Sequence, residues 1–140
     1  MKRILLVEDN GDTSYDIKSQ LESFGYEIKQ ADSYLSALGM WRKYSGEFGC
    51  IILDLNISPE GLDDEDVSSY FPISSLPFLL EIGWGNTPTN AIKVVVYSGY
   101  VNDFKEICET KGISYSGIVI IEKKGTSLSE LINYVVKNVE

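Results

Sequence analysis

The stretch Cys50-Ile51-Ile52-Leu53-Asp54 decides the fold that we predict for this chain. Its first four residues are apolar and follow one another without polar alternation, which is typical of a parallel strand covered by helices on both faces. Similar β-rich runs, each bounded by Gly, Asp, Asn or Ser, lie at Arg3–Val7, Tyr26–Lys29, Lys93–Tyr97 and Ile118–Ile121. With Cys50–Leu53, the sequence therefore predicts five short strands.

Helical periodicity separates these runs. In the first predicted helix, apolar residues recur at Ile17, Leu21 and Phe24, a spacing that places them on one face. The last predicted helix has apolar residues at Leu128, Leu131, Ile132, Val135, Val136 and Val139. Gly25 and Gly112 mark helix ends, and Thr126 or Ser127 is available to cap the last helix.

Strands that alternate with helices predict an α/β fold with a five-stranded parallel sheet, doubly wound as (βα)5 in the flavodoxin-like topology. We expect residues 1–140 to form a single domain, with no effector domain. Ligands bind to such sheets at the carboxyl ends of the strands. The chemistry of the chain is therefore expected at those ends.

A long segment at about 57–89, between the third and fourth strands, departs from this rhythm. It contains an acidic cluster around Asp63 and a helical run near Leu76–Trp84, and Pro72 and Pro77 prevent one continuous helix. One interpretation is an elongated surface loop before a normal third helix. The other is an added docking element built on Tyr70, Phe71 and Trp84.

Composition limits the classes of partner. With 21 acidic and 12 basic residues, the net charge of −9 disfavours nucleic acid and anionic membranes. The absence of histidine excludes a histidine phosphodonor and histidine metal ligands. Cys50 and Cys108 lie in apolar stretches and are expected to be reduced, buried thiols. No segment approaches the ~20 apolar residues that span a bilayer, so we expect a cytoplasmic protein without a membrane partner.

Polar groups gather where the predicted strands end. Glu8 and Asp9 follow the first strand, Asp54 follows the third, Ser98 follows the fourth, and Lys123 or Lys124 follows the fifth. Carboxylates brought close together in a partly buried pocket repel one another unless a divalent cation compensates. Mg²⁺ is the expected cation, because it prefers a few carboxylate oxygens together with waters and phosphate oxygens.

Four stretches with this order and approximate spacing resemble the signature of response-regulator receiver domains of two-component signalling. They are Ile4-Leu5-Leu6-Val7-Glu8-Asp9-Asn10, Ile51-Ile52-Leu53-Asp54-Leu55-Asn56, Val94-Val95-Val96-Tyr97-Ser98-Gly99-Tyr100 and Ile121-Glu122-Lys123. The resemblance covers essentially the whole chain. It implies a non-enzymatic receiver that is phosphorylated by a sensor histidine kinase or a phosphotransfer protein and then signals to a downstream protein, which the sequence does not identify.

The resemblance also implies a role for each site residue. Asp54 would be the phosphoacceptor. Glu8, Asp9, Asp54 and the main-chain carbonyl of Asn56 would hold Mg²⁺, with Asp9 binding directly and Glu8 partly through water. Ser98 would hydrogen-bond the phosphoryl group, and one of Lys123 and Lys124 would pair with the phosphoaspartate.

The chain departs from the family pattern at several positions. Glu8 replaces the commoner aspartate, and neither Lys123 nor Lys124 is followed by the family's proline. Ile120 or Ile121 stands where an aromatic switch residue is usual, and the sequence between Asp54 and Ser98 is longer than in typical members. These departures keep open an alternative, a receiver-like interaction module that works without phosphorylation. A haloacid-dehalogenase-type phosphatase is disfavoured, because such enzymes have Asp-x-Asp after the first strand.

Overall fold

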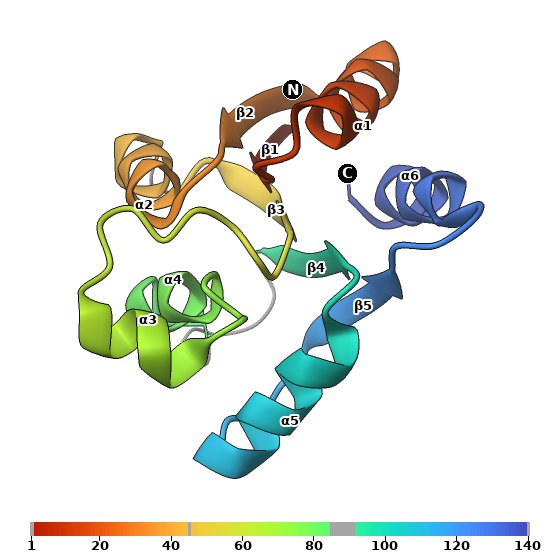
Figure 1. Cartoon of the computed structure of the whole chain (residues 1–140). Coiled ribbons are helices and arrows are strands. Elements are labelled where there is room, and N and C mark those ends of the chain that lie inside the picture. The colour runs from red at the N-terminus through yellow and green to blue at the C-terminus, as the bar shows by residue number, and fades with distance from the viewer. Residues whose placement is uncertain (1, 45, 85–91, 140) are drawn as a thin grey trace.

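The computed structural model describes residues 2–44, 46–84 and 92–139. Within these ranges, one sheet contains five parallel strands in the order β2-β1-β3-β4-β5 (Figure 1). The strands are β1 (Arg3–Val7), β2 (Glu27–Ala31), β3 (Phe48–Leu53), β4 (Lys93–Ser98) and β5 (Ile118–Glu122). The predicted flavodoxin-like α/β topology is confirmed.

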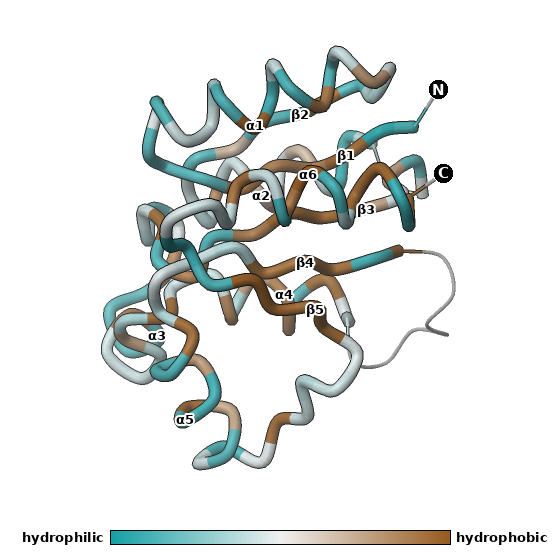
Figure 2. The backbone as a smooth tube through the Cα atoms, turned by 90° about the vertical axis from the view of Figure 1, so that its right-hand side faces the viewer, coloured by the Kyte–Doolittle hydropathy of each residue, from teal (hydrophilic) through white to brown (hydrophobic). Residues whose placement is uncertain are grey.

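The helices form two layers, one on each face of the sheet (Figure 1). They are α1 (Gly11–Ser23), α2 (Tyr34–Lys43), α3 (Asp64–Tyr70), α4 (Leu76–Glu81), α5 (Val101–Lys111) and α6 (Ser127–Asn138). Helices α1 and α6 pack on one face around Leu21, Ile52 and Leu131, whereas α2, α4 and α5 cover the other around Ile51 and Phe104. Figure 2 shows the central strands as the most continuously hydrophobic part of the chain.

Local signals explain where several helices begin and end. The Asn10 side chain caps α1 by accepting from the Thr13 amide at 3.0 Å, and Ser33 and Ser36 form a reciprocal capping box at α2. Gly112 ends α5 in the left-handed conformation, as the sequence predicts. At α6, Thr126 occupies the N-cap position without a side-chain hydrogen bond, and the Ser127 hydroxyl accepts instead from the Lys124 amide.

Some sequence-based boundaries and burial assignments are wrong. Strand β2 begins at Glu27 and not at Tyr26, whose hydroxyl donates to the Val139 carbonyl at the end of α6. Phe24 does not lie on the buried face of α1, because the helix ends at Ser23 and leaves the Phe24 side chain 59% exposed. Val136 of α6 is also exposed, whereas its neighbour Val135 is fully buried.

The described part of the 57–89 segment contains two helices, α3 and α4, joined and preceded by loops. Ile57, Ile73 and Phe78 from this segment are buried in the core beneath α2 and α5. Phe71, one of the aromatic residues of the docking interpretation, is exposed. Residues 85–89 of the segment lie outside the described residues.

Both cysteines, Cys50 and Cys108, are free and buried, as expected. Burial raises the pKa of the Cys50 thiol to about 12 and that of the Cys108 thiol to about 11. Both side chains therefore act as small apolar groups of the core. In the part of the chain that the structure describes, no helix has the length and apolar character needed to cross a membrane.

Candidate metal centre

The backbone of the candidate site is fixed by the sheet itself. Parallel hydrogen bonding continues one residue past three strands. The Glu8 amide donates to the Ala31 carbonyl at 2.9 Å, the Asp54 amide to Val7 at 2.9 Å and the Lys123 amide to Ser98 at 3.0 Å. Three charged side chains therefore leave the carboxyl edge of the sheet from well-defined positions.

The three predicted acidic ligands converge at this edge. Glu8, Asp9 and Asp54 each offer a carboxylate oxygen, and these oxygens lie within 4.8 Å of one another. Glu8 is only 2% exposed and Asp54 only 9% exposed, whereas Asp9 lies at the surface. Two nearly buried carboxylates beside a third require a compensating cation, because unpaired buried charge is strongly unfavourable.

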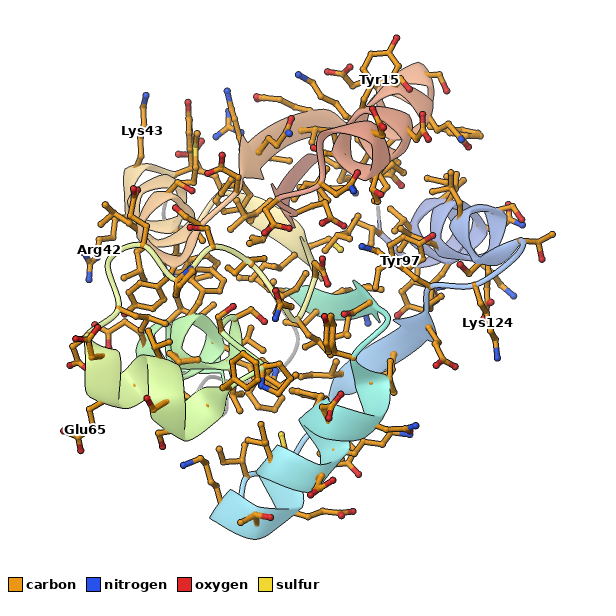
Figure 3. The ribbon with its side chains drawn as sticks, viewed as in Figure 1. Tyr15, Arg42, Lys43, Glu65, Tyr97 and Lys124 are labelled. Carbon is orange, nitrogen blue, oxygen red and sulfur yellow. The ribbon has the colours of Figure 1, made fainter. Side chains whose placement is uncertain are left out.

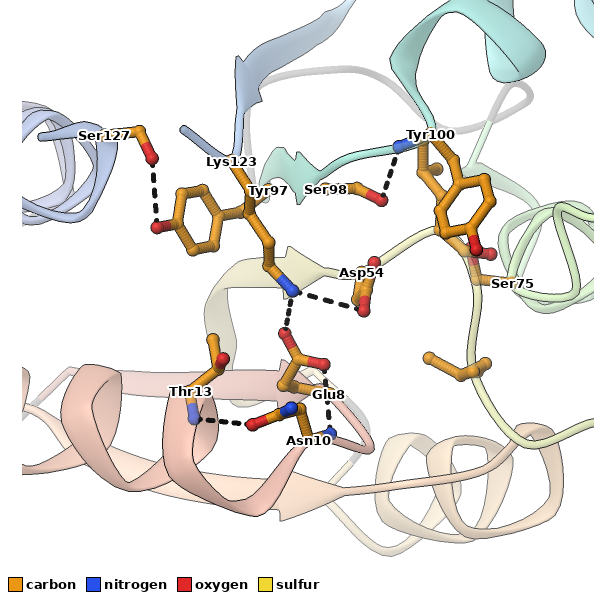
Figure 4. Close-up of polar contacts among 12 residues, drawn as sticks. Glu8, Asn10, Thr13, Asp54, Ser75, Tyr97, Ser98, Tyr100, Lys123 and Ser127 are labelled. Atoms are coloured by element: carbon orange, nitrogen blue, oxygen red, sulfur yellow. Dashed lines mark hydrogen bonds and ion pairs between the residues drawn. The ribbon is translucent and has the colours of Figure 1, made fainter. Parts of the chain in front are cut away.

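Lys123 supplies part of that compensation (Figure 4). Its Nζ lies 2.6 Å from Glu8 Oε1 and 3.3 Å from Asp54 Oδ2, and it also lies 5.5 Å from the centre of the Tyr97 ring. Lys124, the other candidate from the sequence, is 78% exposed and pairs with Glu122 at the surface. Figure 3 shows Lys124 directed away from the molecule, so Lys123 is the lysine that reaches the acids.

Burial and neighbouring charges shift the pKa values of Glu8, Asp9 and Lys123. Burial, followed by the neighbouring Asp54 carboxylate, raises the pKa of Glu8 to about 7, against the opposing effect of Lys123. Burial and the charge of Asp54 also raise the pKa of Asp9. Burial lowers the pKa of Lys123, but the hydrogen bond to Glu8 and the charge of Asp54 outweigh it, so this pKa is raised overall.

The remaining predicted site residues lie at the end of β4 and in the loop that follows β3. Ser98 is fully buried at the end of β4, and its Oγ accepts from the Tyr100 amide at 3.2 Å. Asn56 uses its side-chain Nδ2 to donate to the Pro72 carbonyl at 2.8 Å. The Asn56 side chain thus contacts the 57–89 segment.

The donor set fits Mg²⁺. It consists of carboxylate oxygens, which are hard ligands that this cation prefers, and it includes neither a sulfur nor an imidazole group. Glu8 already holds Lys123 through Oε1 and the Asn10 amide through Oε2. Both carboxylate oxygens of Glu8 therefore already have a hydrogen-bond donor.

Two contributors to the site were not identified from the sequence. The Asn10 amide donates to Glu8 Oε2 at 3.2 Å, and the Asn10 side chain caps α1. Ser74 binds both main-chain groups of Ile57, the residue directly after Asn56 in the loop that follows Asp54. An Asn directly before a helical run, as at Asn10, is a recognisable capping signal, but nothing in the sequence around Ser74 marks it.

Comparison with known proteins identifies the fold. No protein-family model and no curated protein sequence matches the chain. Among solved structures, the receiver domain of a response regulator from Clostridium thermocellum is similar, with a TM-score of 0.64, 22% identity, and coverage of 98% of this chain and 95% of that chain. A CheY-like receiver domain from Methylobacillus flagellatus has a TM-score of 0.65 at 22% identity, covering 100% and 99% of the two chains.

The non-phosphorylated HemR receiver domain from Leptospira biflexa is similar in the same way, with a TM-score of 0.66, 18% identity, and coverage of 100% of this chain and 97% of that chain. Full coverage of both chains means that the likeness extends over the whole sheet and its helices. The chain therefore has the fold of response-regulator receiver domains.

Proposed function

We propose that this chain is a phosphoryl-accepting receiver of a two-component system, with Asp54 as the phosphoacceptor. The observation that carries the proposal is the convergence of Glu8, Asp9 and Asp54 with Lys123 at the carboxyl edge of a receiver-type sheet. The chain would accept a phosphoryl group and report it, and would not turn over a substrate as an enzyme does.

In this proposal, an Asp54 carboxylate oxygen attacks the phosphorus of a phosphohistidine on a sensor histidine kinase or a phosphotransfer protein. The new P–O bond forms as the P–N bond breaks, and the imidazole leaves with the electron pair of that bond and takes up a proton. The donor must be another protein, because this chain contains no histidine. Little covalent chemistry falls to the receiver, so positioning and charge stabilisation dominate.

Each neighbour of Asp54 has a task in that transfer. Mg²⁺ held by Asp9, Asp54, the Asn56 carbonyl and, through water, Glu8 would neutralise charge on the transferring group. Lys123, 3.3 Å from Asp54 Oδ2, would move from Glu8 toward the phosphoryl oxygens. Ser98 would donate its hydroxyl hydrogen to a phosphoryl oxygen and draw the loop to Tyr100 with it, which would change the surface around α5 for a downstream protein. We place this exchange in the cytoplasm.

Beryllofluoride, which mimics an aspartyl phosphate, tests the proposal. In the presence of Mg²⁺ it should change the amide NMR spectrum of the wild-type chain near Ser98 and α5, and Asp54→Asn should abolish the change. Asp103→Asn is the matched control, because Asp103 is an exposed carboxylate in the first turn of α5. A wild-type spectrum that Mg²⁺ and beryllofluoride leave unchanged would refute the proposal.

A second candidate is a receiver-like interaction module that works without phosphorylation. It is favoured by the lysine geometry, since Lys123 lies closer to Glu8 than to Asp54 and its charge offsets part of the acidic charge. Such a module would bind its partner equally well with and without Mg²⁺. A calorimetric titration that detects no Mg²⁺ binding at millimolar concentration would favour this candidate over the first.

A further inference from the structure

The loop that carries Asn56 is held along its whole length by the segment between α3 and α4. The Leu55 carbonyl accepts from the Ser75 amide at 3.2 Å and from the Ser75 hydroxyl at 3.1 Å. Asn56 donates its side-chain N–H to Pro72 at 2.8 Å. Ile57 donates its amide to Ser74 Oγ at 2.9 Å and accepts from the same hydroxyl at 2.6 Å.

Residues 72–75, which bind this loop, are themselves anchored in the core. Ile73 and Ser75 are fully buried, and Ile73 belongs to the core that α2, α4 and α5 share. The other end of the loop is fixed by the sheet, because the Asp54 amide donates to Val7. Residues 55–57 therefore lie between two rigid supports, with the Asn56 carbonyl between them.

We propose that Ser74 is a positioning residue for the metal centre and that residues 72–75 set the direction of the Asn56 carbonyl. The inference rests on the proposed function, in which that carbonyl is a ligand of Mg²⁺. Ser74 touches neither the metal nor the phosphoryl group. It acts through Ile57, whose amide and carbonyl it binds with one hydroxyl.

Metal selectivity distinguishes this role from that of an ordinary structural contact. Mg²⁺ demands near-octahedral geometry at short distances, whereas Ca²⁺ accepts irregular coordination by more oxygens. A loosened 55–57 loop should therefore weaken Mg²⁺ binding more than Ca²⁺ binding. A contact that only stabilises the fold would lower the melting temperature and leave the affinity of the folded protein for both ions unchanged.

The test is calorimetric titration of the full chain with Mg²⁺ and, separately, with Ca²⁺. Ser74→Ala should lower Mg²⁺ affinity roughly tenfold, as loss of outer-sphere support does in other metal sites, and should lower Ca²⁺ affinity less. Ser74→Thr keeps a hydroxyl and should restore Mg²⁺ binding. Ser68→Ala is the matched control, because Ser68 is an exposed serine of α3 in the same segment.

The outcomes separate this inference from the function on which it rests. Absence of Mg²⁺ binding by the wild-type chain would overturn the proposed function and this inference together. Wild-type Mg²⁺ binding that a folded Ser74→Ala variant retains, or an equal loss for both ions, would overturn this inference alone. If Ser74→Ala does not fold, Asn56→Ala tests the claim that residues 72–75 direct the Asn56 carbonyl, since it keeps that carbonyl but loses the bond to Pro72. An unchanged Mg²⁺ affinity, or an equal loss for both ions, would then overturn the inference.

Discussion

At the scale of single residues, position relative to the sheet edge decides what identical side chains do. Lys123 follows β5 immediately, and its ammonium reaches Glu8 and Asp54, whereas the next residue, Lys124, pairs with Glu122 at the surface. Glu8 is almost completely buried. Neighbouring residues of one type thus differ in charge environment because successive side chains at a strand end point in different directions.

Replacement of the two lysines should affect the pKa of Glu8 differently. Lys123→Met should raise the pKa of Glu8 above its value of about 7, because the ammonium opposes the effects of burial and of Asp54. Lys124→Met is the control and should leave that pKa unchanged, since Lys124 does not contact Glu8. Titration of the Glu8 carboxyl carbon by NMR measures both. Equal titration curves for wild type and Lys123→Met would contradict the assigned contact.

At the scale of elements, the loop after β3 connects the site to the rest of the fold. Its residues 58–60 run beside the start of α2, where Tyr34 and Leu35 donate their amides to Ser58 and Glu60. Gly61 then passes so close to Leu35 that an added Cβ would lie 2.8 Å from the Leu35 Cβ, and its φ of +94° disfavours any other residue. This close approach locks the far end of the loop onto α2.

Replacing Gly61 should therefore cost more stability than backbone strain alone explains. Gly25 is a matched control, because its φ of +92° is nearly the same and an added Cβ there would meet nothing within 4 Å. Gly25→Ala should lower the free energy of unfolding by about 1–2 kcal/mol, and Gly61→Ala by about 1–3 kcal/mol more. Urea unfolding measures the difference, and equal losses for the two variants would argue against the contact with Leu35.

The strands and the acids could be predicted from sequence, but the supports of the site could not. Strand β1 has the predicted bounds because the short apolar run from Ile4 to Val7 follows Arg3 and ends abruptly at Glu8. Strand β2, by contrast, begins one residue later than predicted. The Tyr26 side chain instead donates to the Val139 carbonyl at the end of α6, a contact between residues far apart in the chain. The choice between Lys123 and Lys124, and the role of Ser74, depend likewise on tertiary contacts that local periodicity does not encode.

At the scale of the whole molecule, the receiver fold concentrates unfavourable charge at one edge of the sheet. The chain carries a net charge of −9, and its most deeply buried acids lie together where a cation is expected. Folding therefore brings these carboxylates together at an electrostatic cost, which binding of a cation would relieve. Such a cost is typical of functional sites, where strict optimisation of stability gives way to chemistry.

This cost predicts an unusual dependence of stability on pH. The Glu8 carboxyl has a pKa of about 7 in the folded chain and an ordinary value of 4.5, so the folded state holds this proton more tightly than the unfolded state. The stabilisation of the folded state by this proton is fully present below about pH 4.5 and is lost as pH rises through about 7. The loss amounts to at most about 3 to 4 kcal/mol, because one pKa unit corresponds to about 1.4 kcal/mol.

Urea unfolding between about pH 5 and about pH 8, with and without Mg²⁺, checks this dependence. Glu8→Gln should flatten the profile of the metal-free chain, whereas Glu106→Gln, at an exposed position of α5, should leave it unchanged. Mg²⁺ should stabilise the wild type more at high pH than at low pH, because the metal binds the ionised carboxylates. Parallel pH profiles of the unfolding free energy for wild type and Glu8→Gln would mean that Glu8 does not cause the pH dependence. A pH-independent effect of Mg²⁺ would mean that the ion does not bind at these carboxylates.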